Sequence, residues 1–172
     1  SDNITIRNGG NCFFKSDLDA IQDIINTNDK LSNLEPLDVG HQTWIGGRIT
    51  TLAINNANLQ YLPKSIGKLT SLKILHLDNN ELTSLPKSIG NLNNLTELAL
   101  DENQITILPN SIENLTNLQG LSMDNNKLTT LPETIGNLNN LRELYLNYNQ
   151  ITILPESFGN LKNLEILLIY YN

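Results

Sequence analysis

Apolar residues recur along most of the chain at a fixed interval of 23 positions, beginning at Ile49. Each 23-residue unit, called a coil below, follows the pattern LxxLxLxxNxLxxLPxxIxxLxx. In the LxL portion, the alternation of apolar and other positions predicts a short strand with both leucines on one face. One coil carries the full pattern at Leu72, Leu75, Leu77, Asn80, Leu82, Leu85, Pro86, Ile89 and Leu92.

Five complete coils and the strand half of a sixth follow from this register. A unit of 23 residues is too short to enclose a core, so each coil has to stack on its neighbours through a parallel sheet. The pattern therefore predicts an α/β solenoid with a curved parallel β-sheet. The coils span residues 49–71, 72–94, 95–117, 118–140, 141–163 and 164–172.

A proline occupies the same position in every complete coil. Proline has no N–H group and a fixed φ, so it ends the strand half and sets the turn into the outer segment. The outer segment is too short for a long helix, and we expect a 3₁₀ or single helical turn on the convex side of each coil. The prolines are Pro63, Pro86, Pro109, Pro132 and Pro155.

Residues 1–48 lie outside the repeat and are predicted to cap the N-terminal end of the stack, because an open end has to be covered. Within them, "SDLDAIQDIINTND" predicts an amphipathic helix over about 16–28. Ser16 is the expected N-cap, with Asp19 as its capping-box partner. A short strand is expected within 3–7.

The repeated motif resembles that of the leucine-rich repeat family, L-x-x-L-x-L-x-x-N-x-L, over about 120 residues. Its second half, LPxSIGxL, is similar to the 23-residue variant of bacterial repeat proteins and intracellular signalling scaffolds. The resemblance implies an α/β leucine-rich repeat solenoid, with repeats over 49–172, that binds a protein partner through its concave sheet without catalysis. Of the possible settings, a secreted or cell-surface bacterial protein is favoured over an intracellular scaffold.

The resemblance also implies a ladder of asparagines that satisfies buried backbone groups between coils, because a carboxamide both donates and accepts hydrogen bonds. In the first coil Ala57 takes this position, so Asn55, Asn56 or the cap is expected to supply the missing rung. The segment around Trp44 is similar to the junction between cap and first repeat in plant-type members, and Trp44 is expected to plug the core there. The ladder positions are Asn80, Asn103, Asn126, Asn149 and Asn172.

The chain carries 18 acidic and 11 basic residues, a formal net charge of −7. This balance argues against nucleic acid and anionic membranes as partners, since both attract basic surfaces, and leaves a basic protein as a candidate. No apolar stretch approaches the roughly 18 residues of a membrane span. The N-terminus does not read as a signal peptide, although a cleaved or trimmed chain would look the same.

Catalytic and metal-binding candidates are sparse. His41, in the cap, and His76, on a strand, have no nucleophile or metal-ligand partner at a recognisable spacing. Cys12 has no second cysteine to pair with and is expected to be buried as a small hydrophobe. We therefore expect no enzymatic activity, no cofactor and no metal centre.

The outward strand positions form three columns that should face solvent on the concave side. In one column Asp78, Asp101 and Asp124 are predicted to stack about 5 Å apart, where like charges repel. This stripe is expected to recognise a basic patch, to bind a divalent cation weakly or only to keep the face solvated. Tyrosines gather in the later coils, as they do at interface hot spots. The candidate partner-binding residues are His76, Asp78, Glu97, Asp101, Asp124, Glu143, Tyr145, Tyr148, Leu168 and Tyr170.

The last strand, in "NLEILLIYYN", is apolar on both faces and is predicted to form an edge of the sheet. Two alternatives would cover it. Further coils of a longer protein would do so, or a second copy would pair with it along 164–171 as a homodimer. The alternative function is accordingly a structural module that assembles with itself.

Overall fold

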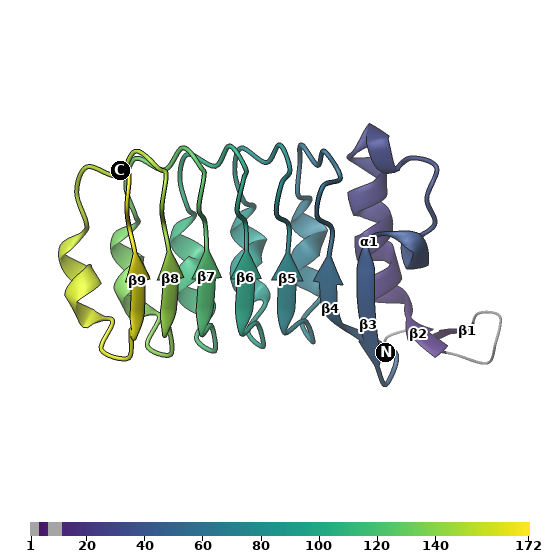
Figure 1. Ribbon diagram of the computed structural model, residues 1–172. Coiled ribbons are helices and arrows are strands. Elements are labelled where there is room, and N and C mark those ends of the chain that lie inside the picture. Colours follow the sequence, from purple (N-terminus) through teal and green to yellow (C-terminus); the bar gives the residue numbers. More distant parts are fainter. Residues whose placement is uncertain (1–3, 7–11) are drawn as a thin grey trace.

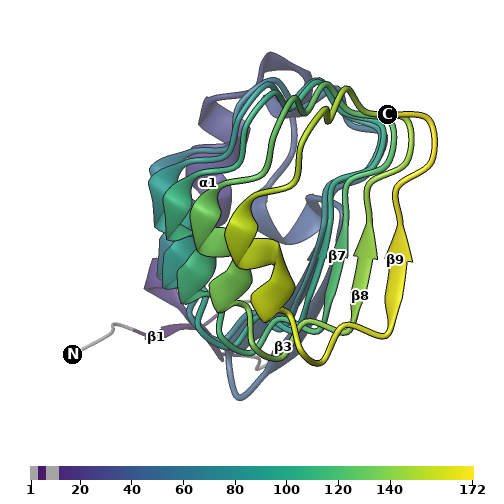
Figure 2. The ribbon, with the colours of Figure 1, turned by 90° about the vertical axis from the view of Figure 1, so that its left-hand side faces the viewer.

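The computed structural model describes residues 4–6 and 12–172 of the chain. A parallel sheet forms one face of the molecule and short helices form the opposite face, with one strand and one helix per coil (Figure 1). Turned by 90°, the coils superpose in projection with the strands on one side and the helices on the other (Figure 2). The predicted α/β solenoid with 3₁₀ turns on the convex side is confirmed.

The repeat strands pair in chain order and in register, so each strand lies beside the same positions of the next coil. The central leucines therefore form one continuous row inside the sheet, and Leu75, Leu98, Leu121 and Leu144 are fully buried. The six strands are β4 (Arg48–Ala53), β5 (Ile74–His76), β6 (Glu97–Ala99), β7 (Gly120–Ser122), β8 (Glu143–Tyr145) and β9 (Ile166–Leu168).

Each repeat proline occupies the N-cap of a five-residue 3₁₀ helix, where its extended backbone leads into the turn. Neighbouring helices approach closely: a Cβ built on Gly90 would lie 2.9 Å from the Cβ of Ser111 and even nearer its carbonyl. A glycine is therefore needed there. The helices are Lys64–Lys68, Lys87–Asn91, Asn110–Asn114, Glu133–Asn137 and Glu156–Asn160.

The cap contains helix α1 (Lys15–Asn26), which packs against the first convex helix, Lys64–Lys68. The prediction of Ser16 as N-cap was wrong: Phe14 holds that position without a side-chain bond, because strand β2 (Cys12–Phe14) leads directly into the helix. Asp19 instead accepts hydrogen bonds from Lys15. The helix buries its apolar stripe, namely Leu18, Ile21, Ile24 and Ile25.

A strand that the sequence reading missed extends the sheet at its N-terminal end. β3 (His41–Ile45) runs antiparallel to β4, and the two are joined at Gly46 and Gly47, both with positive φ. His41 of the cap is therefore the first residue of a strand. Trp44 is half-buried: it packs against the core and meets Phe13 edge to face at 4.8 Å.

The short strand expected within 3–7 is present as β1 (Ile4–Ile6), antiparallel to β2; residues 3 and 7 lie outside the described residues. The expected burial of Cys12 was wrong, because this residue lies on β2 with its side chain exposed. Two short 3₁₀ helices, Asp29–Leu31 and Pro36–Asp38, link α1 to β3.

Candidate functional site

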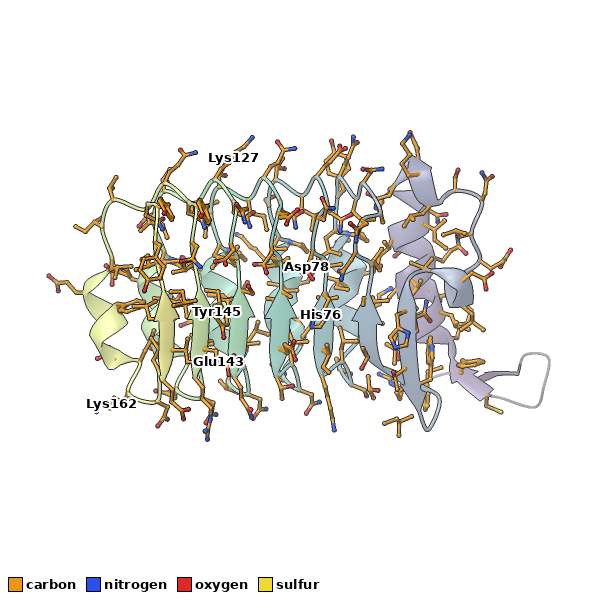
Figure 3. The ribbon with its side chains drawn as sticks, viewed as in Figure 1. His76, Asp78, Lys127, Glu143, Tyr145 and Lys162 are labelled. Carbon is orange, nitrogen blue, oxygen red and sulfur yellow. The ribbon has the colours of Figure 1, made fainter. Side chains whose placement is uncertain are left out.

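The outward positions of the sheet present three columns of side chains on the concave face. Figure 3 shows His76, Glu143 and Tyr145 on the sheet and Asp78 just beyond the end of β5, whereas Lys127 and Lys162 lie at opposite ends of their coils. The register sets Glu97, Gly120 and Glu143 side by side in one column. The next column holds Ala53, His76, Ala99, Ser122, Tyr145 and Leu168.

Two polar pairs join these columns. Nε2 of His76 lies 2.8 Å from Oε1 of Glu97, on the neighbouring strand. The hydroxyl of Tyr145 donates to Oε2 of Glu143 over 2.9 Å. This hydrogen bond, together with desolvation and the negative charges of Glu143 and Asp124, raises the pKa of the Tyr145 phenol. The contact also fixes the direction of the half-buried Tyr145 ring.

The aspartate column forms a ladder to the backbone. Oδ1 of Asp78 accepts the N–H of Asp101 over 3.0 Å, and Oδ1 of Asp101 accepts the N–H of Asp124 over 2.7 Å. Asp124 accepts the N–H of Asn147 in the same way. Asp101 also accepts the hydroxyl of Ser122 over 2.6 Å. The stacked carboxylates are therefore held by the coils themselves, and each has a structural role as well as an outward charge.

Burial disfavours the ionised form of Asp101, one of the three aspartates of this column. Desolvation is the main cause that raises the pKa of Asp101, and the neighbouring charges of Asp78 and Asp124 add to it. The hydrogen bonds from Ser122 and from the Asp124 backbone act in the opposite direction. The net result is that the folded state disfavours the ionised form of Asp101.

From the second coil onward an asparagine at the end of the strand half joins successive coils, and every one but Asn172 is buried. Nδ2 of Asn126 donates to the carbonyls of Leu100, Met123 and Asp124 over 2.9–3.3 Å, and Oδ1 accepts the N–H of Ile105. These donors and acceptors are used within the fold, so the side chain has a structural role. Similar contacts are made by Asn80, Asn103, Asn149 and Asn172.

The cap supplies the rung next to Ala57. Asn28, just after α1, accepts the N–H groups of Gln60 and Tyr61 and donates to the Tyr61 carbonyl over 2.9 Å. Asn55 instead begins the concave ladder, because its Oδ1 accepts the N–H of Asp78. Of the three expected sources of the missing rung, the cap is the one observed.

A second asparagine ladder, missed by the sequence reading, lies at the opposite end of the coils. Nδ2 of Asn117 donates to the Asn93 carbonyl of the preceding coil over 2.7 Å. The available signal was an asparagine at the last position of four successive coils. The ladder consists of Asn94, Asn117, Asn140 and Asn163.

A hollow of about 310 Å³ opens on the concave face over β6, β7 and β8. Gly120 lines it and lies between Glu97 and Glu143 in the register of the strands, and Tyr145 and Arg142 also contribute to its lining. Nη1 of Arg142 lies 3.0 Å from Oε1 of Glu165. In the sequence, the signal for this hollow was Gly120, a residue without a side chain in an outward column between two glutamates. The sequence alone did not predict a site there.

The four tyrosines of the last two coils fall into two groups. Tyr145 and Tyr170 belong to outward columns, whereas Tyr148 and Tyr171 lie in the following loop with φ of +55° and +57°. The rings of Tyr148 and Tyr171 stack 4.7 Å apart and remain 53% and 73% exposed. The structure therefore places Tyr148 beside the concave columns and not within them.

Neither a metal cluster nor a membrane-spanning helix is found where the structure describes the chain. No group of three or more His, Cys, Asp or Glu residues within 4–6 and 12–172 could hold a metal ion. No helix of the described part is both long and apolar enough to cross a bilayer.

Comparison with solved structures gives relatives of the same architecture. A leucine-rich repeat protein of Leptospira interrogans is 42% identical over 70% of this chain, with a TM-score of 0.66; the match covers 30% of that protein's chain. The leucine-rich repeat ectodomain of the receptor kinase SOBIR1 from Arabidopsis thaliana is 26% identical over 93% of this chain and 94% of its own, with a TM-score of 0.75. The PEPR1–AtPEP1 crystal structure matches 90% of this chain at 26% identity and a TM-score of 0.64, over 28% of that chain.

Family models extend these similarities across the repeat. A model described as a leucine-rich repeat region matches residues 48–127. A leucine rich repeat model matches residues 106–151 and 116–172. No curated protein sequence matches the chain. With its 23-residue coils, buried leucine rows and asparagine ladder, the chain belongs to the leucine-rich repeat family.

Proposed function

We propose that the chain is a non-catalytic module that binds a protein partner through the concave face of its sheet. The observation that carries this proposal is an open face of fixed side chains: His76 and Glu97 are paired across strands, and Tyr145 is oriented by Glu143. Within the described residues, no second layer covers this face, because the helices lie on the convex side. Leucine-rich repeat domains typically mediate protein–protein interactions.

The proposed partner presents a basic surface. Asp78, Asp101 and Asp124 stack along the face, and Glu97 and Glu143 lie in a neighbouring column. The net charge of −7 adds a long-range attraction for a cationic protein. Charge complementarity of this kind mainly increases the association rate and weakens with salt.

Site-specific photo-crosslinking tests the proposal. A benzoylphenylalanine at Tyr145 should form adducts with a partner from the native extract, whereas the same group at Glu156, on a convex helix, should not. The captured protein is then purified and its Kd is measured against the native chain and a Glu97→Lys/Glu143→Lys variant. We expect the double variant to bind at least about tenfold more weakly. Equal binding by both chains would contradict the proposal.

A second candidate is self-association through β9. Ile166 and Leu167 point to opposite faces of this strand and are 40% and 36% exposed, so a second copy that pairs along 164–171 would cover both. Light scattering should then show a dimer that Leu168→Lys weakens. A native chain that stays monomeric at high concentration would contradict this candidate. In a longer protein, a following coil would cover the strand instead.

We also propose a secreted or cell-surface location. The support is the similarity to a bacterial leucine-rich repeat protein, that of Leptospira interrogans, at 42% identity over 70% of this chain. Protease added to intact cells of the source organism should degrade the protein. A protein that is protected until the cells are lysed would contradict this location.

A further inference from the structure

We propose that the hollow over Gly120 receives one cationic side chain of the partner, an arginine. This inference rests on the proposed function, because it names the anchor by which the concave face would recognise its partner. Three features of the hollow, which has a volume of about 310 Å³, favour an arginine: its shape, its charge and the Tyr145 ring in its wall.

The shape of the hollow comes from the residues that are small. A Cβ built on Gly120 would have no neighbour closer than Cγ of Glu97, at 4.0 Å. In the adjoining column, Ala99 and Ser122 also line the hollow. Larger side chains stand on either side, so the cavity is a notch in the face and not a flat surface. A long, thin side chain fits a notch of this kind better than a branched apolar one.

The charge of the hollow favours a cation. Glu97 and Glu143 stand on both sides of Gly120, and each uses one carboxylate oxygen for His76 or Tyr145. The second oxygen of each carboxylate remains as an acceptor. The Glu97 side chain is 51% exposed, so a partner can reach it.

The basic residue of the lining does not neutralise these two carboxylates. Arg142 lies 3.0 Å from Glu165, on the far side of the hollow from Glu97. Its charge is thus already matched by a third carboxylate. Glu97 meets Nε2 of His76 through Oε1, and Glu143 meets the Tyr145 hydroxyl through Oε2, so each acidic wall keeps one oxygen for a cation of the partner.

Arginine fits this arrangement better than lysine. A guanidinium is planar and presents donors on two edges, so it can hydrogen-bond to two carboxylates at once. It also stacks on aromatic rings, and the Tyr145 ring stands at the wall with its hydroxyl held by Glu143. An ammonium group would supply charge without the stacking.

Amide NMR with a small probe tests the hollow directly. N-acetyl-arginine-amide should shift the Gly120 and Ser122 amides in a saturable way. N-acetyl-citrulline-amide has a similar shape without the charge and should bind at least about fivefold more weakly. The lysine analogue should fall between them. Equal responses to arginine and citrulline would overturn the proposal.

Filling the hollow gives a second test. Gly120→Leu should abolish the arginine-dependent shifts while leaving the fold intact, because the position is open and its φ is not positive. The matched control is Thr51→Leu, in the same column on β4. Normal arginine binding by a folded Gly120→Leu chain would overturn the inference.

Neutralising the walls gives a third test. Glu97→Gln/Glu143→Gln keeps the shape and should weaken arginine binding about tenfold. Glu113→Gln/Glu156→Gln removes the same charge from convex helices and should leave arginine binding unchanged. Equal losses in both double variants would show a general charge effect and overturn the inference.

The outcomes separate this inference from the proposed function. If a purified partner crosslinks to position 145 but binds native and Gly120→Leu chains equally, the concave face is the interface and the arginine anchor is wrong. If the free arginine probe binds the hollow but no partner crosslinks there, the anchor chemistry stands and the proposed function is wrong.

Discussion

Oδ1 of Asp101 accepts a hydrogen bond of 2.7 Å from the backbone N–H of Asp124, the residue in the same position of the next coil. The same bond recurs between Asp78 and Asp101. An acidic column that faces a partner is therefore also part of the framework that holds the coils together. Its charge and its hydrogen bonds have opposite consequences for stability, and substitutions can separate them.

Asp101→Asn should stabilise the fold at neutral pH by about 0.5–1 kcal/mol. The amide oxygen can still accept from Asp124 and Ser122, while the repulsion between neighbouring carboxylates and the desolvated charge disappear. Asn147 already occupies this column as an amide. Urea unfolding at pH 7 measures the change, with Glu156→Gln as a control of equal charge change. A loss of stability would show that the ionised carboxylate is needed.

The pH dependence of this difference follows from the raised pKa of Asp101. A raised pKa means that the folded state holds the proton more tightly than the unfolded state. The favourable contribution of Asp101 is therefore present in full below its ordinary pKa of 3.8 and is lost as the pH rises through the raised value. The advantage of Asp101→Asn should vanish toward pH 3 and grow as the pH increases above 4.

The repeat made most of the fold predictable, because every coil carries its own copy of the contacts. The leucine rows, the convex 3₁₀ turns and the register of the outward columns all follow from one alignment. β3 lies outside the repeat and had no second copy to support it. Its signal was local: Gly46 and Gly47 between two β-prone segments, a pattern typical of a two-residue hairpin loop.

The site was predictable as a list of outward residues but not as a set of contacts. Alignment placed Asp101 and Asp124 in one column, yet whether a carboxylate reaches the next backbone N–H depends on the offset between coils. The hollow at Gly120 exists because this residue has no side chain, and its shape depends on how the neighbouring side chains are oriented. Cys12 illustrates the same limit, because it alternates with the buried Phe13 along β2 and its exposure depends on which face of that strand meets the core.

Asn126→Ala should destabilise the fold by about 2–3 kcal/mol, because the Leu100 carbonyl and the Ile105 N–H lose a buried partner. Asn117→Ala is the matched control from the exposed ladder, where a single hydrogen bond is lost, and should cost less than about 1 kcal/mol. Urea unfolding of both variants gives the comparison. Similar costs would show that burial of the ladder that contains Asn126 contributes little to stability.

Ser111→Ala should be neutral or stabilise the fold by up to about 1 kcal/mol. The Oγ of Ser111 is buried without a hydrogen-bond partner, beside Gly90 of the preceding coil. In the next coil the same position holds Thr134, whose hydroxyl donates to the Asn110 carbonyl over 2.9 Å. Thr134→Val should therefore cost about 0.5–1 kcal/mol. Thermal unfolding distinguishes the two, and a clear loss in Ser111→Ala would indicate a bound water at that hydroxyl.

Tyr148→Val should destabilise the fold by about 1–3 kcal/mol, whereas Tyr148→Asn should change stability by less than about 1 kcal/mol. Tyr148 has a φ of +55°, where a β-branched side chain is strained, and Asn79 and Asn125 occupy the corresponding positions of earlier coils. Both variants lose the stacking on Tyr171, so their difference isolates the backbone. Urea unfolding measures it. If both variants lose the same stability, the stacked rings and not the left-handed backbone control this loop.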